Sequence, residues 1–255
     1  METNAHVLDG GCWTLMAQHE QVERVSAEFA RDWWKTLMAN SCALLKDGAI
    51  LAAHGSAGRA QALLVLAMEE LAKARWLYDA AEYEWSRPLG LYGLPSTKSG
   101  TVLLPSELST RRLPHLQKLQ AAEQFSSGLG GFWDASRREE YYFPADLITF
   151  EEAARRRNAD KQAGFYVDRL GDAVLTPLAI PSEGIDPFLR RAAQSLEMHL
   201  IEDHTRQQDA VAVHAIDSVQ DLHWEVLPYA HPELFADFAD RIGDVAGPAA
   251  EAEGE

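Results

Sequence analysis

The chain has very little cysteine and no long apolar run, and both absences limit the kinds of protein it can be. Only Cys12 and Cys42 occur among 255 residues, too few for a disulfide framework or a cysteine-rich zinc module. The longest apolar run covers residues 62–68, far short of the roughly 20 residues that span a bilayer. The N-terminus lacks the basic region and apolar stretch of a secretory signal. We therefore expect a soluble, cytoplasmic protein without a structural metal and without membrane contact.

Basic residues are scarce, and their distribution restricts any nucleic-acid contact. The 23 Lys and Arg face 39 Asp and Glu, a net charge of −16, and residues 171–255 alone hold 17 acidic but only 4 basic residues. Affinity for nucleic acid grows with the number of Lys and Arg contacts to phosphates, so we expect no DNA partner. Any RNA contact has to use the central part of the chain. Its basic residues are Arg111, Arg112, Lys118, Arg137, Arg138, Arg155, Arg156, Arg157 and Lys161.

Several catalytic sequence motifs are also missing. The chain contains no His-Glu-x-x-His, no Glu-x-x-His, no Walker loop, no Gly-x-Gly-x-x-Gly and no Gly-x-Ser-x-Gly. These motifs hold metals, cradle phosphates or present a nucleophile. We therefore predict neither a cofactor nor a metal ligand set.

Apolar residues recur mostly at helical spacing, which predicts an all-α bundle. We expect helices over 15–35, 36–53, 56–86, 113–125, 149–163 and 186–215. The pattern of residues 165–168 and 173–178 predicts two strands around a turn at Gly171-Asp172. Together they would form a small β-hairpin insertion. The predicted organisation is a helical core (1–127), an irregular insertion with the hairpin (128–184), additional C-terminal helices (185–246) and a disordered acidic tail (247–255).

Polar residues on otherwise apolar helix faces are the first candidates for a site. At about 100° per residue, Glu70 falls near the middle of the apolar arc of helix 56–86, Lys73 falls at its edge, and Glu69 points further outward. A buried carboxylate is costly unless it is partnered or has a raised pKa. Antiparallel packing would join Glu70 to polar residues of the neighbouring helices. The predicted cluster is Asn40, Asp47, Glu70, Lys73, His115 and Lys118. It is either a functional site or a buried network that fixes the register of the helices.

A second group lies on the last long helix. His199, Asp203 and Arg206 share one helix face. They are either a second site or dimer contact, or a packed imidazole beside an Asp203–Arg206 pair within the helix.

Four segments, in order, resemble the core of the AbiV family of abortive-infection proteins. They are Ala39-Asn-Ser-Cys-Ala-Leu-Leu-Lys-Asp-Gly48, the stretch from Ala60 that ends Ala67-Met-Glu-Glu-Leu-Ala-Lys-Ala74, His115-Leu-Gln-Lys118 and Ala163-Gly-Phe-Tyr-Val-Asp168. The resemblance covers most of residues 37–178. It implies an HEPN-like fold (higher eukaryotes and prokaryotes nucleotide-binding), a role in bacterial defence against phage, and arrest of growth or translation. It also implies a homodimer.

Many HEPN relatives are metal-independent ribonucleases with an R-x4-6-H motif, and this chain departs from that motif. Only three and two residues separate Arg111 and Arg112 from His115, and seven residues separate Arg191 from His199. No Arg and His in the chain have the required spacing.

Two functional hypotheses remain open at the level of sequence. In the first, His115 is the base or acid of RNA cleavage, Lys118, Lys73 or Arg112 stabilises phosphate charge, and Glu70 orients a partner, with Asn40 and Asp47 in support. RNA or the translation machinery is then the target, and a phage protein is the expected trigger. In the second, the protein has no catalytic activity and binds a phage or host protein.

Overall fold

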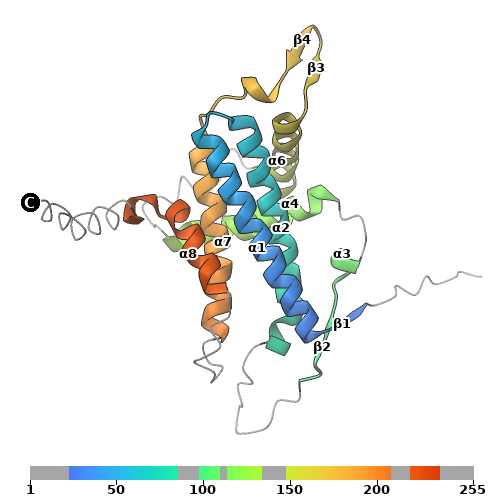
Figure 1. The fold of residues 1–255 in the computed structure, drawn as a ribbon. Coiled ribbons are helices and arrows are strands. Elements are labelled where there is room, and N and C mark those ends of the chain that lie inside the picture. Colours follow the sequence, from blue (N-terminus) through green and yellow to red (C-terminus); the bar gives the residue numbers. More distant parts are fainter. Residues whose placement is uncertain (1–22, 86–97, 110–113, 134–147, 208–218, 236–255) are drawn as a thin grey trace, which may run out of the picture.

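The computed structural model describes residues 23–85, 98–109, 114–133, 148–207 and 219–235 and shows an all-α bundle. Two long helices, α1 (Ala27–Ala53) and α2 (Ala57–Trp85), lie antiparallel at its centre (Figure 1). Around them pack α4 (His115–Trp133), α6 (Phe150–Phe165), α7 (Ile185–Gln207) and α8 (Val219–Ala230). Helix α3 (Ser106–Ser109) is a single turn. The predicted all-α bundle is confirmed.

Helix α1 is one helix where the sequence analysis expected two. Ser26 caps its N-terminus by accepting a hydrogen bond from the backbone N–H of Phe29, and the helix ends at His54 and Gly55, whose φ is +74°. No glycine or proline interrupts the chain near residues 35 and 36, so nothing breaks the helix there. The expected boundary at residue 36 is wrong.

Helix α2 is buried on most of its circumference because it contacts α1, α4, α6 and α7. Its buried residues include small side chains such as Ala62 and Ala72 as well as Leu64, Leu71 and Tyr78. A helix enclosed on several sides lacks a single apolar stripe. One apolar arc is therefore a poor guide to which residues of α2 are buried.

The other helices begin or end near the predicted residues. A capping box between Thr149 and Glu152 opens α6, as the Thr-x-x-Glu spacing favours. Helix α7 begins at Ile185, and its predicted extension beyond Gln207 lies outside the described residues. Helix α7 contacts α1, α2, α4 and α8. The division of the chain into four parts stays a prediction, and residues 247–255 also lie outside the described part.

Two antiparallel strand pairs complete the fold. Strand β1 (Arg24–Ser26) pairs with β2 (Thr101–Leu103), a pairing that the sequence did not predict because three residues are too short to show an alternating pattern. Strands β3 (Asp168–Leu170) and β4 (Ala173–Leu175) form the predicted hairpin around Gly171, with a φ of +60°. The predicted first strand was placed too early, since α6 continues through Phe165. The hairpin projects from one end of the bundle, followed by a short 3-10 helix (Pro177–Ala179; Figure 1).

The core of the bundle is aliphatic and aromatic. Its largest fully buried side chains include Trp34, Met38, Tyr78, Leu119 and Leu196. Among the described residues, no helix combines the length and the apolar character needed to cross a membrane.

Candidate functional site

Glu69 of α2 is buried in the interior of the bundle and binds charged groups of two other helices. Its exposed fraction is 1%, and its carboxylate faces α4 and α6. An ionised carboxylate is stable there only if several donors replace the lost water. Three side chains do so, one imidazole and two ammonium groups.

The imidazole belongs to His115, the first residue of α4. Its Nδ1 lies 2.7 Å from Oε2 and 2.9 Å from Oε1 of Glu69. A carboxylate only accepts, so Nδ1 donates to Glu69 in the tautomer that carries its proton on that nitrogen, and Nε2 is then the ring nitrogen without a proton. The His115 side chain is 55% exposed. The ring therefore contacts the buried carboxylate on one side and is open to solvent on the other.

The two ammonium groups come from different helices and are themselves largely buried. Lys118 lies one turn after His115 on α4, and Lys161 lies on α6; each Nζ is 2.5 Å from a Glu69 oxygen. Their side chains are only 10% and 5% exposed. Lys161 Nζ also lies 3.0 Å from His115 Nδ1. We call Glu69, His115, Lys118 and Lys161 the Glu69 cluster.

The ionisation of Glu69 follows from these contacts. Burial by itself raises the pKa of a carboxyl group, but the hydrogen bonds from Lys118, Lys161 and His115 outweigh it and lower the pKa of Glu69 below its usual value. Glu69 is thus negatively charged at neutral pH. One carboxylate shared by two ammonium groups leaves the cluster with a net charge of about +1 even when His115 is neutral.

The sequence matches a protein-family model. The model HEPN_AbiV, described as AbiV, matches residues 29–197. The chain belongs to the AbiV family. No curated protein and no solved structure matches it. The helical bundle is therefore HEPN-like, as the resemblance implied, and membership of the family supports a role in abortive infection as a defence against phage.

In this AbiV-family chain, Glu70 and Lys73 do not contact His115 and Lys118 as the predicted cluster required. The two residues form an ion pair of 2.6 Å with each other on a partly exposed face of α2. Glu69, which the sequence analysis placed further outward, binds His115 and Lys118 instead. The expected orientation of the two glutamates is wrong, because a single arc of large side chains does not describe a helix that is buried on several sides. Ala62, Val65 and Ala72 lie on the same side of α2 as Glu69 and are buried. Their small apolar side chains were the feature of the sequence that indicated a second buried face.

Two other predicted members, Asn40 and Asp47, do not join the Glu69 cluster. Asn40 and Asp47 are exposed on α1, and Arg112 lies outside the described residues. Lys161 was noted only as a basic residue of the central region. Its place in the cluster depends on the packing of α6 against α2 and α4, which sequence spacing does not reveal.

Two members of the second predicted group on α7, His199 and Asp203, contact side chains of α1. His199 has no exposed surface; its Nε2 accepts a hydrogen bond of 3.0 Å from Trp34 Nε1, and its Nδ1 lies 3.5 Å from Glu202. Burial lowers the pKa of His199, so the ring stays neutral. Asp203 binds Arg31 of α1 through both oxygens, at 2.6 and 2.7 Å. The packed imidazole is confirmed, with an interhelical partner for Asp203.

An arginine lies next to His199 in the folded protein, although no arginine of the chain precedes a histidine at the R-x4-6-H spacing. Arg75 Nη1 of α2 lies 3.5 Å from His199 Nδ1 and also binds Glu202. Because both ring nitrogens face protein groups and the ring is fully buried, His199 has no surface to offer a substrate. Of the two histidines, only His115 combines a fixed ring with access to solvent.

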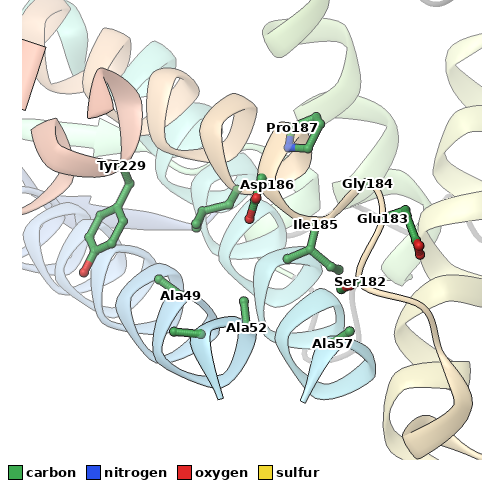
Figure 2. Close-up of a pocket in the computed structure, with 12 residues that line it drawn as sticks. Ala49, Ala52, Ala57, Ser182, Glu183, Gly184, Ile185, Asp186, Pro187 and Tyr229 are labelled. Atoms are coloured by element: carbon green, nitrogen blue, oxygen red, sulfur yellow. The ribbon is translucent and has the colours of Figure 1, made fainter. Parts of the chain in front are cut away.

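Glu183 and Asp186 belong to a pocket of about 650 Å³, where alanines of α1 lie opposite Ile185 and Tyr229 (Figure 2). The pocket shares no residue with the Glu69 cluster, and its carboxylates disfavour an anionic ligand. In the described part of the chain, no group of three His, Cys, Asp or Glu residues is placed to hold a metal ion.

Proposed function

We propose that this AbiV-family protein is a phage-defence effector that cleaves RNA without a metal ion, with the Glu69 cluster as its active site. The observation that carries the proposal is the half-exposed imidazole of His115, held through Nδ1 by a buried carboxylate and flanked by two ammonium groups. A carboxylate that fixes the tautomer of a histidine is the arrangement that makes the other ring nitrogen an effective base.

In the proposed reaction, Nε2 of His115 removes the proton of a ribose 2′-hydroxyl group. The 2′ oxygen then forms a bond to the adjacent phosphorus, and the bond from phosphorus to the 5′ oxygen breaks. Water supplies the proton that the leaving oxygen takes up. The products are a 2′,3′-cyclic phosphate and a 5′-hydroxyl end.

Each other member of the cluster has a separate part in this reaction. Glu69 keeps the proton on Nδ1 and stabilises the imidazolium that forms. Lys118 and Lys161 are too buried to enclose a phosphate, so they act through their charge, which favours an anion beside His115. They are positioning residues for Glu69 and His115 and make the local field positive in a chain whose net charge is −16.

The test is incubation of the purified protein with total RNA and tRNA in a chelator. We expect cleavage by the wild-type protein with 2′,3′-cyclic phosphate ends, and a loss of about 10²- to 10⁴-fold in the His115→Ala variant, the usual range for removal of a general base. His115 is half exposed, so this variant keeps the fold. His204→Ala, at an exposed histidine of α7, is the matched control and retains full activity.

The same variants serve in cells. Expression of the wild-type protein arrests growth or translation, and His115→Ala abolishes the arrest at equal protein levels. Intact RNA with the wild-type protein, or equal cleavage by His115→Ala, would contradict the proposal.

A second candidate function is favoured by the net charge of −16 and by the missing Arg/His motif. It is a non-catalytic effector that binds a phage or host protein. Translation that stops while all RNA remains intact, unchanged by His115→Ala, is the result that this alternative predicts.

A further inference from the structure

Two exposed aromatic side chains lie at the end of α6, one turn beyond a member of the Glu69 cluster. Phe165 is the last residue of α6 and Tyr166 is its C-cap, and their exposed fractions are 40% and 62%. Their rings form an edge-to-face pair with centroids 6.4 Å apart, a favourable geometry for aromatic side chains. Because an edge-to-face contact uses one face of only one ring, the pair keeps flat apolar surface open to solvent. We call Phe165 and Tyr166 the aromatic pair.

The backbone holds the aromatic pair in a fixed place. The backbone N–H of Tyr166 donates to the carbonyl oxygen of Gln162 at 3.0 Å, which closes the last turn of α6. Gly164 packs directly against Gly58, so this end of α6 lies against the start of α2 (Figure 1). The two rings are therefore presented by a packed helix end, and rigid elements make the more precise binding sites.

The aromatic pair lies on the same side of α6 as His115. Lys161 and Phe165 are four residues apart and share a helix face. Side chains of a helix lean towards its N-terminus, so the Phe165 ring lies over the turn that holds Lys161. Lys161 Nζ in turn lies 3.0 Å from His115 Nδ1. Along this side of α6, Ala154 and Lys161 are buried and Phe165 is exposed. The exposed surface thus begins where α4 begins, at His115.

Positive charge and open aromatic surface next to each other fit a ligand that carries both a phosphate and a flat ring. The net charge of about +1 in the Glu69 cluster favours an anion beside His115. Proteins bind single-stranded nucleic acid by combining positive charge along the backbone with aromatic side chains on which bases stack. In duplex RNA the bases are stacked on one another, so their faces are not available to protein rings.

We propose that the aromatic pair binds an unpaired base next to the scissile phosphate, so that the substrate is single-stranded RNA. This inference rests on the proposed function, because that function places the phosphate at His115. Tyr166, the more exposed ring, stacks on the base, and Phe165 supports Tyr166 from the helix end. Stacking tolerates any base, since every base has an aromatic face. The site therefore selects unpaired RNA and not a particular base sequence.

Binding is measured on the full chain with His115→Ala, which removes the proposed base of the reaction. The probe is a fluorescein-labelled single-stranded RNA of about 12 nucleotides, in a chelator, with a duplex of the same sequence for comparison. We expect fluorescence anisotropy to show tighter binding of the single strand. Adding Tyr166→Ala weakens the binding of the single strand about 5- to 150-fold, the usual loss for one stacked base.

Matched variants separate stacking from other effects of substitution. Tyr166→Phe keeps the ring and retains the affinity, whereas Tyr166→Leu keeps apolar surface without a ring and loses affinity as Tyr166→Ala does. Tyr83→Ala is the control and leaves binding unchanged. Tyr83 is also 62% exposed, but it lies near the end of α2, far along that helix from Gly58.

Cleavage kinetics distinguish this proposal from the proposed function. Tyr166→Ala raises KM about 5- to 150-fold with little change in kcat, because stacking stabilises the bound substrate and the transition state alike. His115→Ala lowers kcat instead. Single-stranded RNA that binds through Tyr166 and is never cleaved supports the base site and contradicts the proposed function alone. Equal affinity for single strand and duplex, or equal affinity and KM in Tyr166→Ala and Tyr83→Ala, would overturn the base site.

Discussion

At the scale of single residues, the neighbours Glu69 and Glu70 have opposite environments although they are chemically identical. Glu69 is enclosed by α4 and α6 and balances two buried ammonium groups. Glu70 forms an ion pair one turn along its own helix with Lys73, near the surface. Successive residues of a helix differ by about 100° in direction. That rotation alone separates the centre of a candidate active site from an ordinary surface pair.

This difference predicts unequal effects of the same substitution. Glu69→Gln leaves two buried ammonium groups without a counter-charge, so we expect the free energy of unfolding to fall by about 3 kcal/mol. Glu70→Gln removes one partly exposed ion pair and costs less than about 1 kcal/mol. Urea denaturation of the two variants at pH 7 measures both values. Similar losses in the two variants would show that Glu69 is not the buried charge that the contacts indicate.

At the scale of elements, the candidate site depends on how closely α6 approaches α2. A Cβ atom at Gly164 of α6 would lie 2.2 Å from the backbone oxygen of Gly58 and 2.8 Å from Cβ of Ala62. Only glycine permits this contact between the helices. Lys161 lies one turn before Gly164, so the same close approach brings Lys161 to Glu69.

Gly164→Ala is therefore expected to separate the two helices. We expect a loss of about 1 to 3 kcal/mol in the free energy of unfolding, the usual cost of overpacking, together with reduced RNA cleavage as Lys161 moves from Glu69. Gly128→Ala is the control, since Gly128 lies in α4 with open space around it, and alanine there stabilises the helix by up to about 1 kcal/mol. Thermal unfolding and the cleavage assay measure the two effects. An undiminished melting temperature in Gly164→Ala would contradict the account.

At the scale of the whole molecule, buried carboxylates connect the helices to one another. Glu69 joins α2 to α4 and α6, Glu123 of α4 binds Arg157 of α6 and Arg191 of α7, and Asp203 joins α7 to α1. Glu197 of α7 binds His231, just beyond α8, at 2.8 Å. The bundle is thus held by ionised groups in addition to its apolar core, and its stability depends on pH.

Glu202 gives a direct test of that dependence. Burial opposes its ionisation, but contacts with His199 and Arg75 outweigh this and lower the pKa of Glu202 to about 2. A carboxyl group whose pKa is lower in the folded state stabilises the fold above its unfolded pKa, and this contribution is lost as the pH falls through the folded value. The stabilisation by Glu202 is therefore complete at pH 7 and disappears between about pH 4.5 and 2.

The difference in unfolding free energy between the wild-type protein and Glu202→Gln isolates this group. We expect roughly 2 to 3 kcal/mol at pH 7, shrinking towards zero near pH 2. Urea denaturation at a series of pH values gives the curve, with exposed Glu183→Gln as the control. A difference that stays constant with pH would rule out the lowered pKa.

The sequence predicted the elements better than the contacts between them. Helical spacing, the Thr149–Glu152 capping box and the Gly171-Asp172 turn are local signals, so α2, α6, α7 and the hairpin were found near their observed positions. His115 and Lys118 were correctly expected to share a site with a carboxylate from the α2 region. The identity of that carboxylate was wrong, and Lys161 was missed, because both depend on which helices enclose α2.

The amino-acid sequence by itself determined the helical architecture, the scarcity of cationic surface and the kinship with the AbiV family, since periodicity, composition and ordered motifs are properties of the chain. Only the tertiary structure decided which glutamate is buried, that Lys161 completes its ion pairs, and that His199 is enclosed while His115 reaches solvent. The physical reason is that the cost of burying a charge is set by every element packed around it. The residues next to a charge in its own helix do not show which other helices will surround it.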